Sequence, residues 1–243
     1  ACIGRYHPPS HQFDWGDIRA HLGRSFLVPG NIFTLLRCLV MLLLITAAVT
    51  NVKPLVPLVN DRNYDALLLR LDILLCGGFD PYAWLSARRT PFLTRWLNAA
   101  YMSLFFFYCL SLVILFVQKR REMRVLVLSM LLAKLVGNTV HFAMPSLGDV
   151  YVAERAHLYA NMPEKPTVCF IQNILWEDRM RLLRNPERYT PRNPFTGIAA
   201  FPSLHCALFA VMILVAWRCH RWLLPLYVPV GILMSISTLY FGW

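Results

Sequence analysis

Long apolar segments alternate along the chain with shorter polar segments that are rich in turn-forming residues. A helix needs about 20 mainly apolar residues to cross the hydrocarbon core of a bilayer. Segments of about that length occur at residues 31–50, 98–117, 125–143, 201–217 and 222–243. The pattern predicts an all-α fold: a polytopic membrane helix bundle with five spans in one membrane-embedded domain, residues 31–243.

The first apolar segment has a second interpretation, because it ends in the small residues Thr46, Ala47 and Ala48, as a secretory signal peptide does. A long polar stretch precedes it, however, and four further spans follow. These features favour a membrane-spanning helix.

Three polar stretches carry apolar residues at helical spacing, which predicts interfacial amphipathic helices. In the first, Asp65 and Asp72 lie opposite an apolar face. That face consists of Leu67, Leu68, Leu71, Leu74 and Leu75. The turn residues of 77–81 end this helix. A second short piece covers residues 84–96, and a third covers residues 168–183.

The third span differs from the others because it contains polar residues at spacings of four and three. Lys134, Asn138 and His141 therefore share one helical face. Ionisable groups at membrane depth usually face a bundle interior or a polar cavity, which predicts a polar wall of an active site. The alternative is a lysine that extends to the interface and a histidine that is paired structurally.

The residues Phe201-Pro202-Ser203-Leu204-His205 mark the start of the fourth span. Proline suits the first turn of a helix, so we expect Pro202 to begin it, with the free amide groups that follow forming an anion site. Ser203 adds a hydroxyl donor, and His205 adds an imidazole that can protonate a leaving group. The alternative is a helix start with a capping serine and an incidental histidine.

Composition agrees with a membrane location, since 57% of the 243 residues are hydrophobic and only 15% are charged. The net charge of +11 raises the possibility of a nucleic-acid partner. The basic residues flank apolar segments, however, which indicates contact with anionic lipid headgroups, so we expect no nucleic acid. The seven cysteines have no metal-ligand or redox spacing. We therefore expect no metal, no cofactor and no disulfide framework.

Two short basic connections, residues 119–124 and 218–221, fall on the same side of a five-span bundle. Short basic loops mark the cytoplasmic side of a membrane protein. Residues 1–30 then form a cytoplasmic tail, whereas residues 53–97 and 144–200 face outward. The motif that ends in His205 is thereby placed on the exoplasmic side.

This motif resembles the second signature, P-S-x-H, of the type-2 phosphatidic acid phosphatase and haloperoxidase superfamily. The third signature of that family is S-R-x5-H-x3-D. Ser237 and Thr238 match its start in part, and its spacing places the expected His directly after Trp243. The resemblance thus implies a chain truncated at its C-terminus.

Within that superfamily, the chain resembles the inositol phosphorylceramide synthase (inositolphosphotransferase) branch. Thr238 replaces the usual Arg, and Leu204 replaces the usual Gly. Residues 75–81 and 142–148 also resemble segments of that branch. The resemblance covers roughly residues 60–243.

The resemblance implies a bundle of six spans, of which five are present, and phosphoryl transfer through a phospho-histidine intermediate. The nucleophilic His and its orienting Asp would begin the missing last helix. Ser203 and the backbone amide of Leu204 would hold the phosphate. His205 would protonate the leaving oxygen and then act as base.

The first signature, K-x6-R-P, is not matched, because Lys134 is followed at that spacing by His141 and Phe142. The phosphate-binding cations of the family are therefore unassigned. Lys134, His141 and Arg192 are the substitutes that the sequence offers.

Three functions fit these features. The first is a lipid phosphotransferase that moves an inositol-phosphate-type headgroup to a lipid or alcohol. The second is a lipid phosphate phosphatase, and the third is a non-enzymatic membrane protein with a decayed site. The implied partners are the bilayer and a phospholipid or sphingolipid substrate. The expected location is the inner membrane of a bacterium or an endomembrane of a eukaryote.

The predicted orientation can be tested by labelling single cysteines placed in a background whose seven native cysteines are serine. Cysteines at positions 122 and 220 should react only with reagents that enter from the cytoplasm, and a cysteine at 190 should react from outside. Labelling of position 122 by an impermeant reagent added outside would reverse the orientation.

Overall fold

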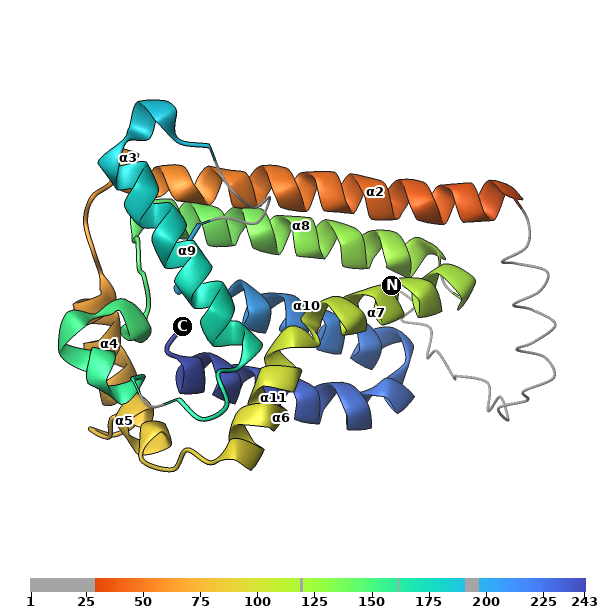
Figure 1. Ribbon diagram of the computed structural model, residues 1–243. Coiled ribbons are helices and arrows are strands. Elements are labelled where there is room, and N and C mark those ends of the chain that lie inside the picture. Colours follow the sequence, from red (N-terminus) through yellow and green to blue (C-terminus); the bar gives the residue numbers. More distant parts are fainter. Residues whose placement is uncertain (1–28, 119, 161, 191–196) are drawn as a thin grey trace, which may run out of the picture.

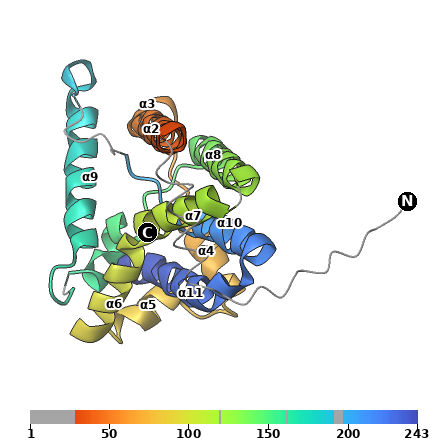
Figure 2. The ribbon, with the colours of Figure 1, turned by 90° about the vertical axis from the view of Figure 1, so that its right-hand side faces the viewer.

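A computed structural model describes residues 29–118, 120–160, 162–190 and 197–243, in which every regular element is a helix. The long helices are α2 (Pro29–Val52), α7 (Leu104–Gln118), α8 (Arg120–Ala143), α10 (Leu204–Cys219) and α11 (Leu224–Phe241). Figure 1 shows them running along one another, and Figure 2 shows α2 and α8 nearly end-on and side by side. The predicted all-α fold is confirmed for the described residues.

Shorter helices gather mainly at the end of the bundle where α2 and α8 finish, which we call the outer end (Figure 1). They are η1 (Lys53–Leu55), α3 (Val56–Val59), α4 (Asp65–Leu75), α5 (Pro81–Ser86), α6 (Pro91–Met102), η2 (Asp149–Tyr151), η3 (Ala153–Leu158), α9 (Thr167–Arg184) and η4 (Pro186–Arg188). At the opposite, inner end, η5 (Arg221–Leu223) joins α10 to α11, and Arg218 lies 3.9 Å from Glu122 of α8. The two basic connections therefore share one end, as predicted.

Among the described residues, two helices are long and apolar enough to cross a membrane, Arg121–Ala143 and Arg221–Phe241. A third candidate is the pair α6 and α7, which is bent by 43° at Ser103. The predicted fourth span is a shorter apolar helix, Leu204–Cys219. These helices make the chain a membrane protein, and the count of five spans stays a prediction.

One of the three predicted amphipathic helices needs correction. The first and third correspond to α4 and α9, but the stretch 84–96 is not one helix. It is divided between α5 and α6 because Thr90 caps α6, its hydroxyl accepting from the Leu93 amide at 3.2 Å, and Pro91 begins a new first turn. The residues of the predicted second span, 98–117, are divided between the end of α6 and α7.

The last apolar helix ends before the C-terminal residue, although the sequence predicts that it continues to Trp243. Gly242 has a φ of 75°, which is left-handed. The Gly242 amide donates to Leu239 O at 3.2 Å, and the Trp243 amide donates to Thr238 O at 2.9 Å. This is the hydrogen-bond pattern of a glycine C-cap, so α11 ends at Phe241.

Two apolar cores hold the helices together. The larger lies between α7, α8, α10 and α11, and its most buried members include Leu112, Leu126 and Phe209. The smaller packs α5, α6, α9 and α11 around Leu97 and Tyr240. By contrast, the apolar face of α4 is exposed, with Leu74 at 72% and Leu75 at 84%. An exposed apolar face next to the spans is what a helix in the membrane interface presents.

One buried carboxylate holds the loops of the outer end together. Asp65 is 8% exposed and accepts hydrogen bonds from the amides of Leu147, at 3.0 and 3.1 Å, and Gly148, at 3.0 Å. The neighbouring Ser146 carbonyl accepts from the Ala200 amide at 3.1 Å. The start of α4, the loop after α8 and the loop before α10 are thus linked through Asp65.

A second polar network fixes the loop after η2. Arg155 forms ion pairs with Asp80, at 2.8 Å, and with Asp149. The Tyr159 hydroxyl donates to Asp149 at 2.7 Å, and the Val150 amide donates to Gly242 O at 3.2 Å. This loop is therefore fastened both to α5 and to the turn after α11.

Replacing Asp65 by alanine should leave two amides, one buried and one partly buried, without an acceptor, which costs about 1–3 kcal/mol. We expect Asp65→Ala to lower the midpoint of thermal unfolding in detergent, whereas Asp61→Ala, at an exposed neighbouring carboxylate, should not. Equal midpoints for the two variants would show that Asp65 does not hold the outer end together.

Candidate active site

The helix that starts within the motif begins two residues later than the predicted start at Pro202. α10 begins at Leu204, and Ser203 is its N-cap, with its hydroxyl accepting from the Cys206 amide at 3.4 Å. Pro202 precedes the cap, so the prediction that it begins the helix is wrong. The Ser203 hydroxyl gives the Cys206 amide an acceptor, so Ser203 rather than Pro202 marks the N-terminal boundary of α10.

The start of α10 still provides hydrogen-bond donors. The Ala207 amide donates to Ser203 O at 3.1 Å, and the Cys206 amide is capped. In the described part of the chain, the amides of Leu204 and His205 have no acceptor. The Ser203 hydroxyl accepts in the cap and keeps its own hydrogen to donate. Three donors therefore remain at this helix start, where the helix dipole also favours an anion.

Aromatic stacking holds His205 in place at the second position of α10. Its ring is parallel to that of Tyr101 in α6, with centroids 4.1 Å apart and an angle of 25°. The Trp243 ring is in turn parallel to Tyr101, with centroids 6.4 Å apart. Among the described residues, no hydrogen bond occupies the imidazole nitrogens of His205. The ring is thus oriented by its faces, while its nitrogens stay available for proton transfer.

The predicted polar face of α8 lies beside the motif. A Cβ added to Gly137 would come 2.5 Å from Leu204 Cδ2, so α8 and the start of α10 are closely packed. His141 is 3% exposed, interacts with the backbone of Ile198 and Phe201, and has a buried Nδ1 with no hydrogen-bond partner. The structure therefore brings His141 to the loop that precedes Ser203.

Lys134 points toward the neighbouring helix. Its Nζ donates to Thr46 Oγ1 of α2. Its charge also acts on Lys53, which follows α2 in η1. Asn138 shares the same face, and its buried Oδ1 has no hydrogen-bond partner.

The sequence did not single out Lys53 as a site residue. Its charge acts on both His141 and His205. Burial, followed by the charge of Lys134, lowers the pKa of Lys53 to about 8. A lysine just after a span normally extends to the headgroups, so the sequence carried no signal that this one turns inward.

Arg179 of α9 is a further cation that the sequence did not identify. Its charge acts on His141, and it also interacts with the carboxylate of Asp65. Burial lowers the pKa of Arg179 although Asp65 opposes this. The described carboxylates form no ion pair with Lys53, Lys134 or the two histidines.

Two further predicted residues, Ser237 and Thr238, have hydroxyl groups that are occupied within their own helix. Ser237 and Thr238 are buried in α11, where their hydroxyls donate to Met234 O and Ser235 O at 2.7 Å each. Arg192 lies outside the described residues. In the described part of the chain, no group of three or more histidine, cysteine or acidic residues is arranged to hold a metal ion.

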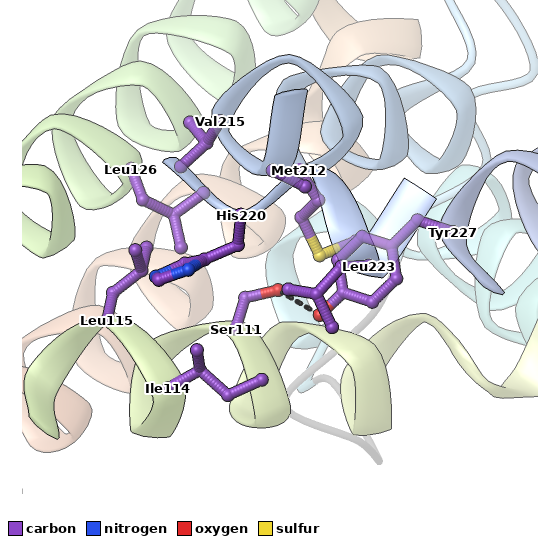
Figure 3. Close-up of a pocket in the computed structure, with 10 residues that line it drawn as sticks. Ser111, Ile114, Leu115, Leu126, Met212, Val215, His220, Leu223 and Tyr227 are labelled. Atoms are coloured by element: carbon purple, nitrogen blue, oxygen red, sulfur yellow. Dashed lines mark hydrogen bonds between the residues drawn. The ribbon is translucent and has the colours of Figure 1, made fainter. Parts of the chain in front are cut away.

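A small cavity lies at the inner end of the bundle, away from this site. It has a volume of about 10 Å³ and is lined mainly by apolar residues of α7, α8, α10 and α11. Figure 3 shows His220 pointing into it, beside the hydrogen bond between Ser111 and Tyr227, which is 2.9 Å long. Its size and apolar walls do not suit a phosphate.

A protein-family model described as "PAP2 superfamily" matches residues 67–243. The match includes α8, the motif and α11, and thus every described site residue except Lys53. No curated protein and no solved structure shows a significant match to the chain.

Proposed function

This chain belongs to the PAP2 superfamily, and on that premise we propose that it is a membrane phosphotransferase that moves a phosphorylated lipid headgroup to an alcohol acceptor. Membership of the superfamily supports phosphatase-type or phosphotransferase-type activity in general. The transferase proposal rests on the sequence resemblance of Leu204 and Thr238 to the inositolphosphotransferase branch. The phosphatase, with water as acceptor, is the alternative.

One observation carries the proposal: His205 lies beside free backbone amides, a serine hydroxyl and cationic side chains that have no paired carboxylate. Amides and cations stabilise the negative charge of phosphate oxygens, most strongly where water is largely excluded. An imidazole next to them can transfer a proton without a metal. A site whose only role was structural would pair its buried charges, so this combination favours phosphoryl transfer.

In the proposed reaction, a His directly after Trp243 attacks phosphorus and forms a P–N bond. The P–O bond to the leaving lipid alcohol breaks, and His205 gives its proton to that oxygen. An acceptor alcohol then attacks phosphorus and loses its proton to His205, while the P–N bond breaks. The position of Trp243, parallel to the ring that stacks on His205, supports a nucleophile at this point of the chain.

The role of His205 as general acid can be tested in the full-length protein with two substrates. His205→Ala should lower turnover of a lipid with an alkoxide leaving group by about 10²- to 10⁴-fold. It should have a much smaller effect on a nitrophenyl phosphodiester, whose leaving group needs no proton. His157→Ala, at an exposed histidine of the outer end, is the matched control. Equal losses on both substrates would make His205 a positioning residue.

The acceptor can be identified by letting alcohol and water compete. A transferase should pass the headgroup to an added lipid or alcohol acceptor with ping-pong kinetics. We expect transfer product to rise with acceptor concentration while hydrolysis falls. If hydrolysis is independent of acceptor, the phosphatase alternative is correct, and absence of any turnover would favour a non-enzymatic protein.

A further inference from the structure

Lys53 is a partly buried cation, and the charge of one other lysine, Lys134, acts on it. Its own charge acts in turn on His141 and His205. No ion pair or hydrogen bond with another described residue satisfies its ammonium group. Burying an ammonium without an opposite charge costs free energy, and a second lysine nearby increases that cost. The Lys53 ammonium group therefore needs an anionic partner, and the described residues do not supply one.

The backbone around Lys53 is fixed against the loop that leads to the motif. A Cβ added to Gly197, whose φ is 102°, would lie 2.5 Å from Lys53 Cβ and 2.9 Å from Pro54 N. Only glycine allows this close approach, because it has no Cβ and tolerates a left-handed φ. Lys53 is thus held against the segment that carries Ser203 and His205.

The chain just after Lys53 is attached to the end of α8 as well. Asn60 Nδ2 donates to Phe142 O at 2.8 Å, and the Tyr64 amide donates to Pro145 O at 3.0 Å. Both acceptors lie in the short stretch that follows His141. Lys53 therefore lies in a fixed position between the residues of α8 and those of α10, and not on a free loop.

We infer that Lys53 binds the phosphate oxygens of the substrate, together with the free amides at the start of α10; this inference rests on the proposed function. A phosphate placed between Lys53, His141 and His205 supplies the missing counter-ion. With a pKa of about 8, Lys53 is mainly charged at neutral pH. Lys134, whose Nζ donates to Thr46, adds to the positive potential at Lys53.

A structural role and a ligand-binding role for Lys53 predict different effects of its removal on the stability of the protein. If Lys53 held α2 to the bundle, removing its charge would destabilise the protein. If it binds a ligand, the empty site carries an uncompensated charge, so Lys53→Met should unfold at the same temperature or higher.

The test measures thermal unfolding of the full-length protein in detergent, with and without inorganic phosphate. Phosphate should raise the midpoint of the wild type, since a ligand of the folded state stabilises it. It should raise that of Lys53→Arg similarly and that of Lys53→Met or Lys53→Gln much less. Lys165→Met, at an exposed lysine of the outer end, should respond like the wild type.

Kinetics supply a second measurement. Hydrogen bonds to charged groups contribute enough that Lys53→Met should lower kcat/KM by about 10- to 100-fold, with substantial recovery in Lys53→Arg. An unchanged phosphate response in both Lys53→Met and Lys53→Gln would overturn the inference, as would a wild type that does not respond to phosphate. Failure of headgroup transfer with a normal phosphate response would instead count against the proposed function alone.

Discussion

The arrangement of the loops at the outer end depends on one set of hydrogen bonds, those accepted by the Asp65 carboxylate. Through Leu147 and Gly148 it orders the loop after α8, and through Ser146 and Ala200 that loop orders the approach to α10. A carboxylate is well suited to this task because its two oxygens accept several bonds at once. The bilayer requires its spans to satisfy their own backbone groups, so chemistry is concentrated in such loops and helix ends.

Around this support, the molecule gathers positive charge without compensating it. Lys53 and Lys134 come from two different helical segments and form no ion pair with a described carboxylate, whereas Arg179 interacts with Asp65. An ordinary protein interior pairs buried charges or removes them. A site that must bind a phosphate benefits from leaving them unpaired, because the ligand then provides the balance.

Aromatic residues complete the arrangement by limiting the freedom of the imidazole. Tyr101 stacks on His205, and Trp243 lies parallel to Tyr101. Stacking fixes the plane of the ring without occupying its nitrogens. The glycine turn at Gly242 brings Trp243 back toward this stack, and the Arg155 network holds the adjacent loop in place. The C-terminal residue is therefore positioned by tertiary contacts near the proposed proton donor.

The sequence by itself determined that the chain is helical and membrane-embedded, since hydrophobic runs and their spacing are local properties. It also identified the motif of Ser203 and His205 and the polar face of Lys134 and His141, because short spacings fix which residues share a helix face. Only the tertiary structure decided that Ser203 caps α10, that the stretch 84–96 is divided at Thr90, and that Lys53 joins the site. Lys53 is separated from His205 by most of the chain, and the glycine contact that brings it inward depends on how three segments pack, which no local pattern specifies.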